Sequence, residues 1–442
     1  MKTFKLGGIH PKENKFSAGK KIIQSALPKQ VVIPLSHYIG SPSEAVVAKG
    51  DIVKAGQLIG KANGFISANV HSSVSGKVSK IDVQLDATGY KRLAVFIDVE
   101  GDEWLETIDR SNDLKTECTL TKEEIIKKIA DAGIVGLGGA TFPAHVKLSP
   151  PPGKKADVLL INAVECESYL TCDHQLMLEK GQEIMVGISI LMKALDVKKA
   201  KVGIENNKKD AIALFQQLAK SHNGIEIIPL KVQYPQGGEK QLIDAVIGRQ
   251  VPSGALPIEV GAVVQNVGTS FAVYEAVQKN KPLVERVITI TGKSATNPGN
   301  YLVRLGTMLS EVVEQAGGVP EDTGKIVGGG PMMGRSFMTL DVPMAKGSAG
   351  VLFMQNAESK RKPMQNCIRC GKCVTVCPMG LAPYLLMSQS EREMWPEMEA
   401  EKVMDCIECG SCSYTCPSNR ALLDYIRFGK STVGGIIRNR KQ

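Results

Sequence analysis

The period of the apolar positions changes along the chain. Short alternating runs broken by Gly, Pro and Asn occupy residues 31–98 and predict an all-β unit. Helical and strand patterns alternate over residues 120–285, with strands at ADVLLINAV, AKVGIE and IEIIPLKV, which predicts helices layered on a mainly parallel sheet. RVITITG and GKIVGGGPMMG predict strands of a small α+β unit over residues 286–355.

Helix ends carry capping signals. TKEEIIKKIADAG opens with a capping box, Thr121 to Glu124, and closes at Gly133. QEIMVGISILMKALDV and KKDAIALFQQLAKS have helical periodicity between the predicted strands. Near the C-terminus, APYLLMSQSEREMWPEMEAE predicts one helix that links two groups of cysteines.

The all-β unit contains AKGDIVKAGQLIGKANGFISANVHSSVSGKV, which resembles the flattened barrel of biotinyl and lipoyl domains. In those domains a lysine at the hairpin tip carries the swinging cofactor. Counting back from SGKV, Phe65 occupies that place, so no amide to a carrier group can form there. A shifted hairpin would instead bring Lys61 to the tip.

Charge and composition restrict the function classes. The formal net charge is +9 over 442 residues, and no apolar run approaches the ~18 residues of a membrane helix. We therefore expect a soluble or membrane-peripheral protein. No basic block has interleaved aromatic residues, so nucleic acid is not an expected partner. The start of the chain lacks the apolar core of a secretion signal, which with reduced thiols indicates the cytoplasm.

The cysteine spacing C-x-x-C-x-x-C-x-x-x-C-P occurs twice, and it is typical of two-cluster bacterial ferredoxins. In that arrangement three cysteines hold one cubane and the fourth crosses to the other. We assign one cluster to Cys367, Cys370, Cys373 and Cys416, and the other to Cys406, Cys409, Cys412 and Cys377. A zinc site would lack the third C-x-x-C step and the trailing C-P, and a disulfide framework does not suit a large chain without a signal peptide. Cys118, Cys166 and Cys172 are left over.

A glycine-rich loop, AGIVGLGGATFPAHVKL, follows the capped helix. Its bare backbone N–H groups could approach a phosphate or a flavin edge, although glycine runs are often plain turns. Glu165 and Glu167 are spaced i, i+2, which places both carboxylates on one face if the segment is a strand. They are either site residues or solvated charges at a strand end.

These stretches gain weight in combination. The glycine loop, INAVECESYLTCDH, YPQGGEKQLI and VVQNVGTS resemble, in this order, the flavin- and NADH-binding subunit of respiratory complex I. That family has G-x-G-G-A-G-F-P, N-A-D-E-S-E-P, G-E-E and N-N-V-E-T. With the barrel in front and two ferredoxin clusters behind, nearly the whole chain resembles the C subunit of the Rnf complex, a membrane ion pump exchanging electrons between NADH and ferredoxin.

The resemblance implies two [4Fe-4S] clusters and FMN as cofactors, and NADH as substrate. It places Phe142 against the nicotinamide or flavin and Glu167 near the hydride-transfer face. The residues it assigns to FMN binding are Gly136, Gly138, Gly139, Lys147, Asn162, Glu165, Gly237, Gly238, Glu239, Asn266 and Thr269. Three family residues are replaced, by Val164, Cys166 and Lys240, which removes polar or acidic groups and should make the flavin easier to reduce.

The implied partners are the other Rnf subunits, including the ferredoxin-like, cluster-bearing B subunit and the membrane subunits. The implied place is the cytoplasmic face of the bacterial inner membrane. Two other functions stay open. A corrin reductase of propanediol-utilising microcompartments shares the barrel, flavin loop and paired clusters. The second is a non-catalytic assembly subunit: the sodium-pumping quinone reductase has a related subunit that lacks the cluster cysteines, although all eight are retained here.

We therefore expect a multidomain α/β protein whose parts follow the order of the patterns. The predicted parts are an N-terminal arm (1–30), a barrel-sandwich hybrid (31–105), a Rossmann-like α/β flavin and NADH domain (119–285), a β-grasp module of the SLBB type (286–355), and a bacterial-type two-[4Fe-4S] ferredoxin domain with a C-terminal tail (360–442).

Overall fold

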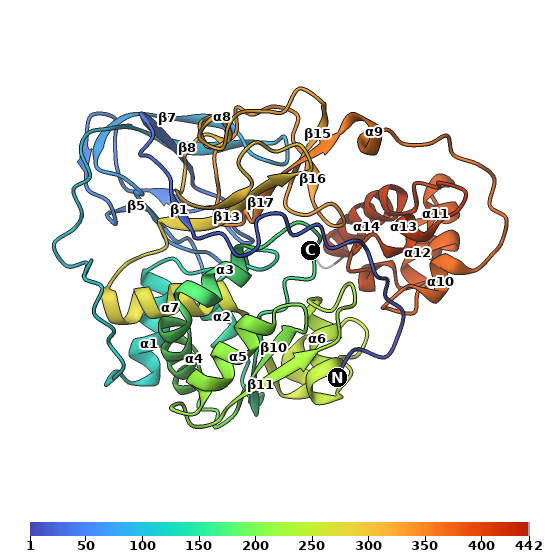
Figure 1. The fold of residues 1–442 in the computed structure, drawn as a ribbon, viewed down its shortest axis with the longest axis horizontal. Helices are drawn as coiled ribbons and strands as arrows, with labels where there is room; N and C mark the ends of the chain where they lie inside the picture. The colour runs from blue at the N-terminus through green and yellow to red at the C-terminus, as the bar shows by residue number, and fades with distance from the viewer. Residues whose placement is uncertain (441–442) are drawn as a thin grey trace.

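A computed structural model describes residues 1–440, and the predicted parts follow one another along the chain, with the barrel and α/β parts sharing one apolar core (Figure 1). We call them the N-terminal arm, the barrel unit, the α/β unit, the mixed-sheet unit and the C-terminal unit, with the residue bounds predicted above. Figure 1 shows the C-terminal unit, in red, at one side of the molecule, joined to the mixed-sheet unit by a long orange segment.

The barrel unit consists of two small antiparallel sheets, as its alternating pattern predicts. One sheet has the order β2 (Gln30–Pro34), β8 (Lys91–Val99), β7 (Gly76–Leu85) and β4 (Ile52–Val53); the other has β3 (Glu44–Ala45), β5 (Leu58–Lys61) and β6 (Val70–His71). Phe65 lies in the loop between β5 and β6 with 62% of its surface exposed, so the hairpin register predicted from SGKV is confirmed.

The α/β unit is built on a four-stranded, fully parallel sheet. The strand order is β11 (Ile225–Leu230), β10 (Ala200–Glu205), β9 (Val158–Asn162) and β12 (Ala262–Asn266). Alternate residues of β9 enter different cores: Leu159 and Ile161 join one cluster, and Val158 and Leu160 join the other. A parallel sheet buried on both faces explains the continuous apolar run in ADVLLINAV.

Helices cover both faces of this sheet. α4 and α7 pack together on one face, and α6 contacts β9 and β10 from the other. The capping box at Thr121 is confirmed, because Glu124 N–H donates to Thr121 Oγ1 and Thr121 N–H donates to Glu124 Oε2. The helices are α1 (Lys122–Asp131), α2 (Ala144–Lys147), α3 (Cys172–Glu179), α4 (Gly181–Leu195), α5 (Lys209–Ala219), α6 (Glu239–Ile247), α7 (Val267–Lys279) and the 3₁₀ turn Pro257–Val260.

The mixed-sheet unit receives a strand from the distant N-terminal arm. Its sheet has the order β1 (Ile23–Gln24), β14 (Gly299–Arg304), β13 (Glu285–Gly292), β17 (Gly350–Gln355), β15 (Thr323–Gly328) and β16 (Arg335–Ser336). The helices α8 (Leu309–Gln315) and α9 (Asn356–Ser359) complete the unit. β1 pairs parallel to β14, so the arm is tied into this sheet by backbone hydrogen bonds.

The C-terminal unit is helical, and one prediction for it is wrong. The chain between the two cysteine groups forms two helices, α11 (Pro383–Glu391) and α12 (Trp395–Ala400), where the sequence pattern predicted one. Glu393 takes a left-handed φ of 55°, and Pro396 lies in the first turn of α12, which a proline can begin but not continue through. The other elements are α10 (Lys372–Thr375), the 3₁₀ turn Val403–Asp405, α13 (Ser411–Thr415) and α14 (Leu422–Asn439).

The N-terminal arm runs along the other units. Lys2 bridges to Leu230 and Ile9 to Tyr234, both on the α/β unit, before β1 joins the mixed sheet. Figure 1 shows the arm, in dark blue, passing between the green α/β unit and the red C-terminal unit. No helix among residues 1–440 has both the length and the apolar character needed to span a membrane.

Candidate functional site

The predicted site residues gather at the carboxyl edge of the parallel sheet. β9 and β12 are neighbours, and their last residues, Asn162 and Asn266, are register partners. The chain leaves β9 towards β10 and β11 and returns on the other side to β12, so the strand order reverses between β9 and β12. Ligands of open α/β sheets bind in the crevice beyond such a switch point.

The glycine-rich loop lies against this edge. Leu137 N–H donates to Thr269 Oγ1 at 2.9 Å, and Gly136 N–H donates to the Phe142 carbonyl at 2.9 Å. A Cβ on Gly138 would come within 2.5 Å of the Asn266 amide nitrogen, so the loop rests directly on that side chain. A Cβ on Gly139 would meet no atom of residues 1–440 within 4 Å, and this backbone therefore faces open space.

Asn266 organises the start of α7. Its Oδ1 accepts from Gly268 N–H at 2.8 Å and from Thr269 N–H at 3.2 Å, which caps the helix. Its Nδ2 donates to Asp173 Oδ2 at 2.7 Å. Thr269 is fully buried behind the glycine loop. The two residues therefore hold the loop and the helix N-terminus; their predicted contact with the ribityl phosphate end stays a prediction.

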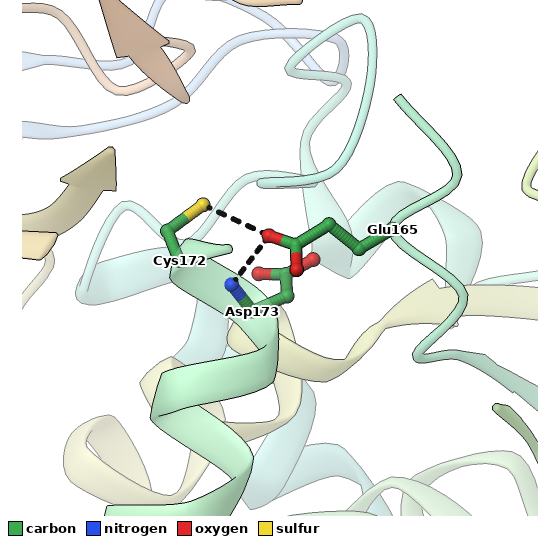
Figure 2. Close-up of side chains that lie close together, drawn as sticks. All are labelled: Glu165, Cys172 and Asp173. Atoms are coloured by element: carbon green, nitrogen blue, oxygen red, sulfur yellow. Dashed lines mark hydrogen bonds between the residues drawn. The ribbon is translucent and has the colours of Figure 1, made fainter. Parts of the chain in front are cut away.

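Glu165 lies beside α3, as Figure 2 shows. Its Oε1 accepts from Asp173 N–H at 2.8 Å and from the Cys172 thiol at 3.4 Å, and its Oε2 accepts from His174 N–H at 3.1 Å. Glu165 thus satisfies the first turn of α3. Burial, and then the nearby Glu165 charge, raises the pKa of Asp173 to about 6.

The expectation that Glu165 and Glu167 share one face of a strand is wrong. β9 ends at Asn162, and Glu165 takes a left-handed φ of 47° in the loop that follows. The two carboxylates therefore diverge. Glu167 turns to the β15–β16 connection, where it accepts from Met333 N–H at 2.7 Å and Met332 N–H at 3.2 Å. Burial raises the pKa of Glu167.

Two lysines donate hydrogen bonds to backbone carbonyls of this loop, residues 163–170. Lys15 of the N-terminal arm donates to the carbonyls of Glu165, Glu167 and Leu170 at 3.0, 2.8 and 2.7 Å. Lys208, which is buried, donates to the Val164 carbonyl at 2.7 Å. Burial, and then the Lys208 charge, lowers the pKa of Lys15.

The remaining predicted residues lie at the end of β9, at the start of α6 and on or next to α2. Asn162 Nδ2 donates to the Gly237 carbonyl at 2.8 Å, and Gly238 is the residue from which α6 begins. Lys147 on α2 pairs with Glu239 at the start of α6, Nζ to Oε1 2.8 Å. Phe142, which precedes α2, is half-buried.

The three departures from the family pattern lie at different depths. Val164 is fully buried in the core on the α6 face. Cys166 accepts a hydrogen bond from Gly237 N–H at 3.3 Å, and burial raises its pKa. Lys240 pairs with Asp405 of the C-terminal unit, with Nζ 3.7 Å from Oδ1. The effect of these replacements on flavin potential stays a prediction.

This edge of the sheet fits a flavin nucleotide. Bare glycine backbone faces open space at Gly139, Asn266 at the start of α7 lies against Gly138, and the Lys147 ammonium pairs with Glu239 at the start of α6. Backbone N–H groups and a cation are what a phosphate needs. Sequence reasoning missed Asp173, Lys15 and Lys208. Asp173 lay within the INAVECESYLTCDH stretch, whereas nothing local marks the two lysines.

One cysteine group surrounds an enclosed pocket. Cys377, Cys406, Cys409 and Cys412 line it together with apolar side chains such as Leu386 and Ile426. We call these four cysteines the proximal set, because Cys409 O accepts from Tyr234 OH of the α/β unit at 2.8 Å. Burial raises the pKa of Cys406 to about 11 and that of Cys412 to about 12, and iron is the kind of positive charge that stabilises such thiolates. Cys377, from the first cysteine group, thus lines the pocket formed by three cysteines of the second group.

The other four cysteines, the distal set, lie further out. Cys367 and Cys370 are exposed, and Cys373 and Cys416 are half-buried. Burial raises the pKa of Cys373, and Cys373 and Cys416 both pack against the apolar core of the C-terminal unit. The donors of each set suit a cubane: three thiolates come from one short loop, in which a glycine at positive φ (Gly371 or Gly410) follows the second cysteine, and the fourth comes from the other group.

Of the three leftover cysteines, Cys118 and Cys172 lie apart from both sets, whereas Cys166 packs against the apolar cluster that contains Cys409. Cys118 is half-buried against the main core, Cys172 is buried beside Glu165, and Cys166 lies against Gly237. The two histidines near the site are also engaged elsewhere. His174 Nε2 meets Asp210 Oδ1 at 2.8 Å, and His145 Nε2 meets the Phe65 carbonyl at 3.0 Å.

Comparison with solved structures finds the same fold in a larger enzyme. A chain of NAD+-reducing [NiFe]-hydrogenase, in the H2-reduced state, aligns with a TM-score of 0.51 at 18% identity, over 71% of this chain and 62% of that one. The air-oxidized state gives the same TM-score at 19% identity.

Family profiles match the chain in the predicted order. The RnfC barrel sandwich hybrid domain matches residues 2–102, the Nuo51 FMN-binding domain residues 129–275, the SLBB domain residues 287–336 and the 4Fe-4S dicluster domain residues 360–417. The predicted fold class is thereby confirmed. The first match begins within the N-terminal arm, so the arm belongs with the barrel in that family's description.

Curated relatives extend over nearly the whole chain. The C subunit of the proton-translocating ferredoxin:NAD(+) oxidoreductase complex of Clostridium ljungdahlii is 46% identical, covering 98% of this chain and 94% of its own. The C subunit of the Na(+)-translocating complex of Acetobacterium woodii is 44% identical, over 98% and 97%. The C subunit of the ion-translocating oxidoreductase complex of Rhodobacter capsulatus is 39% identical, over 87% and 75%. On the strength of these relatives and the four ordered profiles, the chain belongs to the RnfC family, the C subunits of Rnf complexes.

Proposed function

We propose that this chain is the electron-input subunit of a membrane-bound, ion-translocating ferredoxin:NAD+ oxidoreductase. It exchanges electrons with NADH at an FMN site and carries them through two [4Fe-4S] clusters. The observation that carries the proposal is that the unit with the glycine-rich loop and the Asn162–Asn266 edge is joined to a four-cysteine pocket by the hydrogen bond from Tyr234 OH to Cys409 O.

With FMN bound, the crevice supplies a centre that takes a hydride as two electrons and passes them on singly. The chain's own residues bind and orient it. The glycine loop offers backbone N–H groups, and Lys147, which pairs with Glu239, offers an ammonium. Phe142 and Glu167 act at the face where NADH approaches, and Asn162, Glu165 and Glu239 complete the walls.

Two clusters in series fit the positions of the cysteine sets. The proximal set adjoins the α/β unit, and the distal set carries the exposed Cys367 and Cys370. We assign the proximal set to exchange with the flavin and the distal set to exchange with the next one-electron carrier.

The partners follow from the family. This chain is a subunit of a multisubunit complex, and we assign the ferredoxin-like, cluster-bearing B subunit of that complex as the neighbour of the distal set. The membrane subunits hold the complex at the cytoplasmic face of the cell membrane, to which this chain is peripheral. The curated relatives are named for protons in one case and for Na+ in another, so either ion can be coupled in this family.

Neither of the other functions is favoured. The curated relatives are named as subunits of ion-translocating oxidoreductase complexes, and the corrin reductase receives no support from them. A non-catalytic role does not require eight cysteines with ferredoxin spacing.

Anaerobic purification followed by NADH titration tests the proposal. We expect one FMN and about eight iron atoms per chain, from two four-iron clusters. NADH should bleach the flavin absorption and then produce the EPR signals of reduced cubanes. A chain that holds both cofactors yet shows neither change on NADH addition would refute the proposed function.

A further inference from the structure

Three parts of the chain meet beside the proximal cysteine set. Residues Gly7–Ile9 of the N-terminal arm lie between the Gln233–Tyr234 segment of the α/β unit and the Val376–Cys377 segment of the C-terminal unit. Gly8 N–H donates to the Val376 carbonyl at 3.0 Å. Cys377 is the ligand that crosses between cysteine groups, so the arm touches the backbone of the pocket itself.

The arm is fixed equally firmly on its other side. Ile9 and Tyr234 exchange two backbone hydrogen bonds, each 2.9 Å, and Gln233 Nε2 donates to the Gly7 carbonyl at 2.9 Å. Tyr234 is 2% exposed, and its hydroxyl donates to Cys409 O at 2.8 Å. Ile9, Tyr234 and Cys409 share one small apolar cluster. The arm therefore joins both units at one point.

Gly7 is the tightest element of this junction. Its φ of 70° is left-handed, and a Cβ there would lie 2.6 Å from the Val376 carbonyl oxygen and 2.7 Å from the Cys377 carbonyl. Both neighbours are backbone atoms, which cannot rotate out of the way. A side chain at Gly7 would therefore push the arm and the Val376–Cys377 segment apart.

We propose that this junction, Gly7–Ile9 with Tyr234, Val376–Cys377 and Cys409, is a positioning device that sets the distance between the flavin crevice and the proximal cluster. The reason is physical: electron transfer through protein slows steeply as donor and acceptor separate. The residues of the junction act by holding the two units together rather than by touching the reacting groups. The inference rests on the proposed function, because it assumes that electrons pass between these two sites.

A matched pair of glycine substitutions tests the proposal. Gly7→Ala introduces the clash, whereas Gly19→Ala has the same backbone demand, φ 72°, with no atom of residues 1–440 within 4 Å of the new Cβ. Strain at φ is thus common to both variants, and only Gly7→Ala displaces the cluster segment. Each is purified anaerobically as the full chain, with FMN and iron counted.

Gly7→Ala should keep its FMN, and rapid mixing with NADH should bleach its flavin at the wild-type rate. Reduction of the clusters, followed by freeze-quench EPR, should slow at least about tenfold. Hydrogen exchange at residues 374–380 should also quicken, which reads the displacement without any turnover. Gly19→Ala should match the wild type in all of these. Equal cluster reduction and equal exchange in the two variants would overturn the proposal.

If Gly7→Ala does not fold or loses its clusters, Tyr234→Phe tests the proposal instead. It removes the single hydrogen bond to Cys409 O and keeps the ring in place. Cluster reduction should slow by several-fold with flavin reduction unchanged, and an unchanged rate would again overturn the proposal. Failure of the proposed function looks different, because the wild type itself would then show no reduction of clusters by NADH.

Discussion

Lys147 and Glu239, which were predicted separately as FMN ligands, form an ion pair with each other. Lys147→Ala removes the cation from the flavin crevice. A charge-assisted hydrogen bond is worth roughly 1.5–3 kcal/mol, so FMN affinity should fall about tenfold or more. Flavin fluorescence titration measures the dissociation constant. Lys155→Ala is the control, since Lys155 pairs with Asp196 at the opposite end of β9. An unchanged FMN affinity in Lys147→Ala would place Lys147 outside the site.

Lys15 supports the loop that carries both predicted glutamates. Lys15→Met deletes donors to three carbonyls, which should cost about 1–3 kcal/mol of unfolding free energy and weaken FMN binding by loosening residues 163–170. Denaturant unfolding and FMN titration measure the two effects. Lys12→Met, at an exposed neighbour, should change neither. A stable Lys15→Met variant with full FMN affinity would contradict this.

Asp173 should make stability depend on pH. Its folded pKa, about 6, exceeds the ~3.9 of an unfolded chain, so the folded state binds the proton more tightly. Stability should therefore fall as pH rises from about 4 to about 6 and level off above, by on the order of 2 kcal/mol from this group. Asp173→Asn should remove that part of the slope in unfolding experiments across pH. Parallel curves for the variant and the wild type would contradict the assignment.

At the scale of elements, the barrel hairpin between β5 and β6 places Phe65 at its exposed turn. An aromatic ring cannot form the amide that a carrier lysine forms. Intact-mass analysis of the apo-chain should accordingly give the mass of the unmodified sequence. A mass increase equal to a biotinyl or lipoyl group would show that another residue, with Lys61 at the end of β5 the nearest candidate, serves as carrier.

The helices and strands predicted from the sequence agree with the structure where neighbouring residues determine the element. β9, α4 and the cap of α1 fall where apolar period and capping residues predicted them. The shared strand face predicted for Glu165 and Glu167 is wrong, because Glu165 takes a left-handed backbone conformation. No residue type in the sequence requires that conformation there. Lys15 could not be found at all: its partners lie about 150 residues away along the chain, and such pairing leaves no local mark.

At the scale of the whole molecule, the crevice and the cluster ligands lie in units that are separate in sequence. Cys370→Ala should destroy or convert the distal cluster, and Cys377→Ala should damage the proximal one, because its thiolate belongs to the proximal pocket. Neither change touches the crevice, so both variants should keep FMN and should still reduce an artificial acceptor with NADH. Transfer to the one-electron partner should collapse in both.

A paired assay on each purified cysteine variant, with iron and FMN counted, measures this. The wild type and Cys118→Ala serve as controls, since Cys118 packs against the main core and belongs to neither set. Should artificial-acceptor turnover drop in step with partner reduction while FMN stays bound, the order of flavin first and clusters second is wrong.

The N-terminal arm also has a consequence for how the protein is made. The arm is synthesised long before its partners, because Gly8 pairs with Val376 and Thr3 with Gln233 and Gln236. Such distant pairing is slow, and the contact of Gly8 with Val376 must await synthesis of most of the chain. The arm thus reaches its final place late in synthesis, and its docking closes the assembly around the proximal cysteine set.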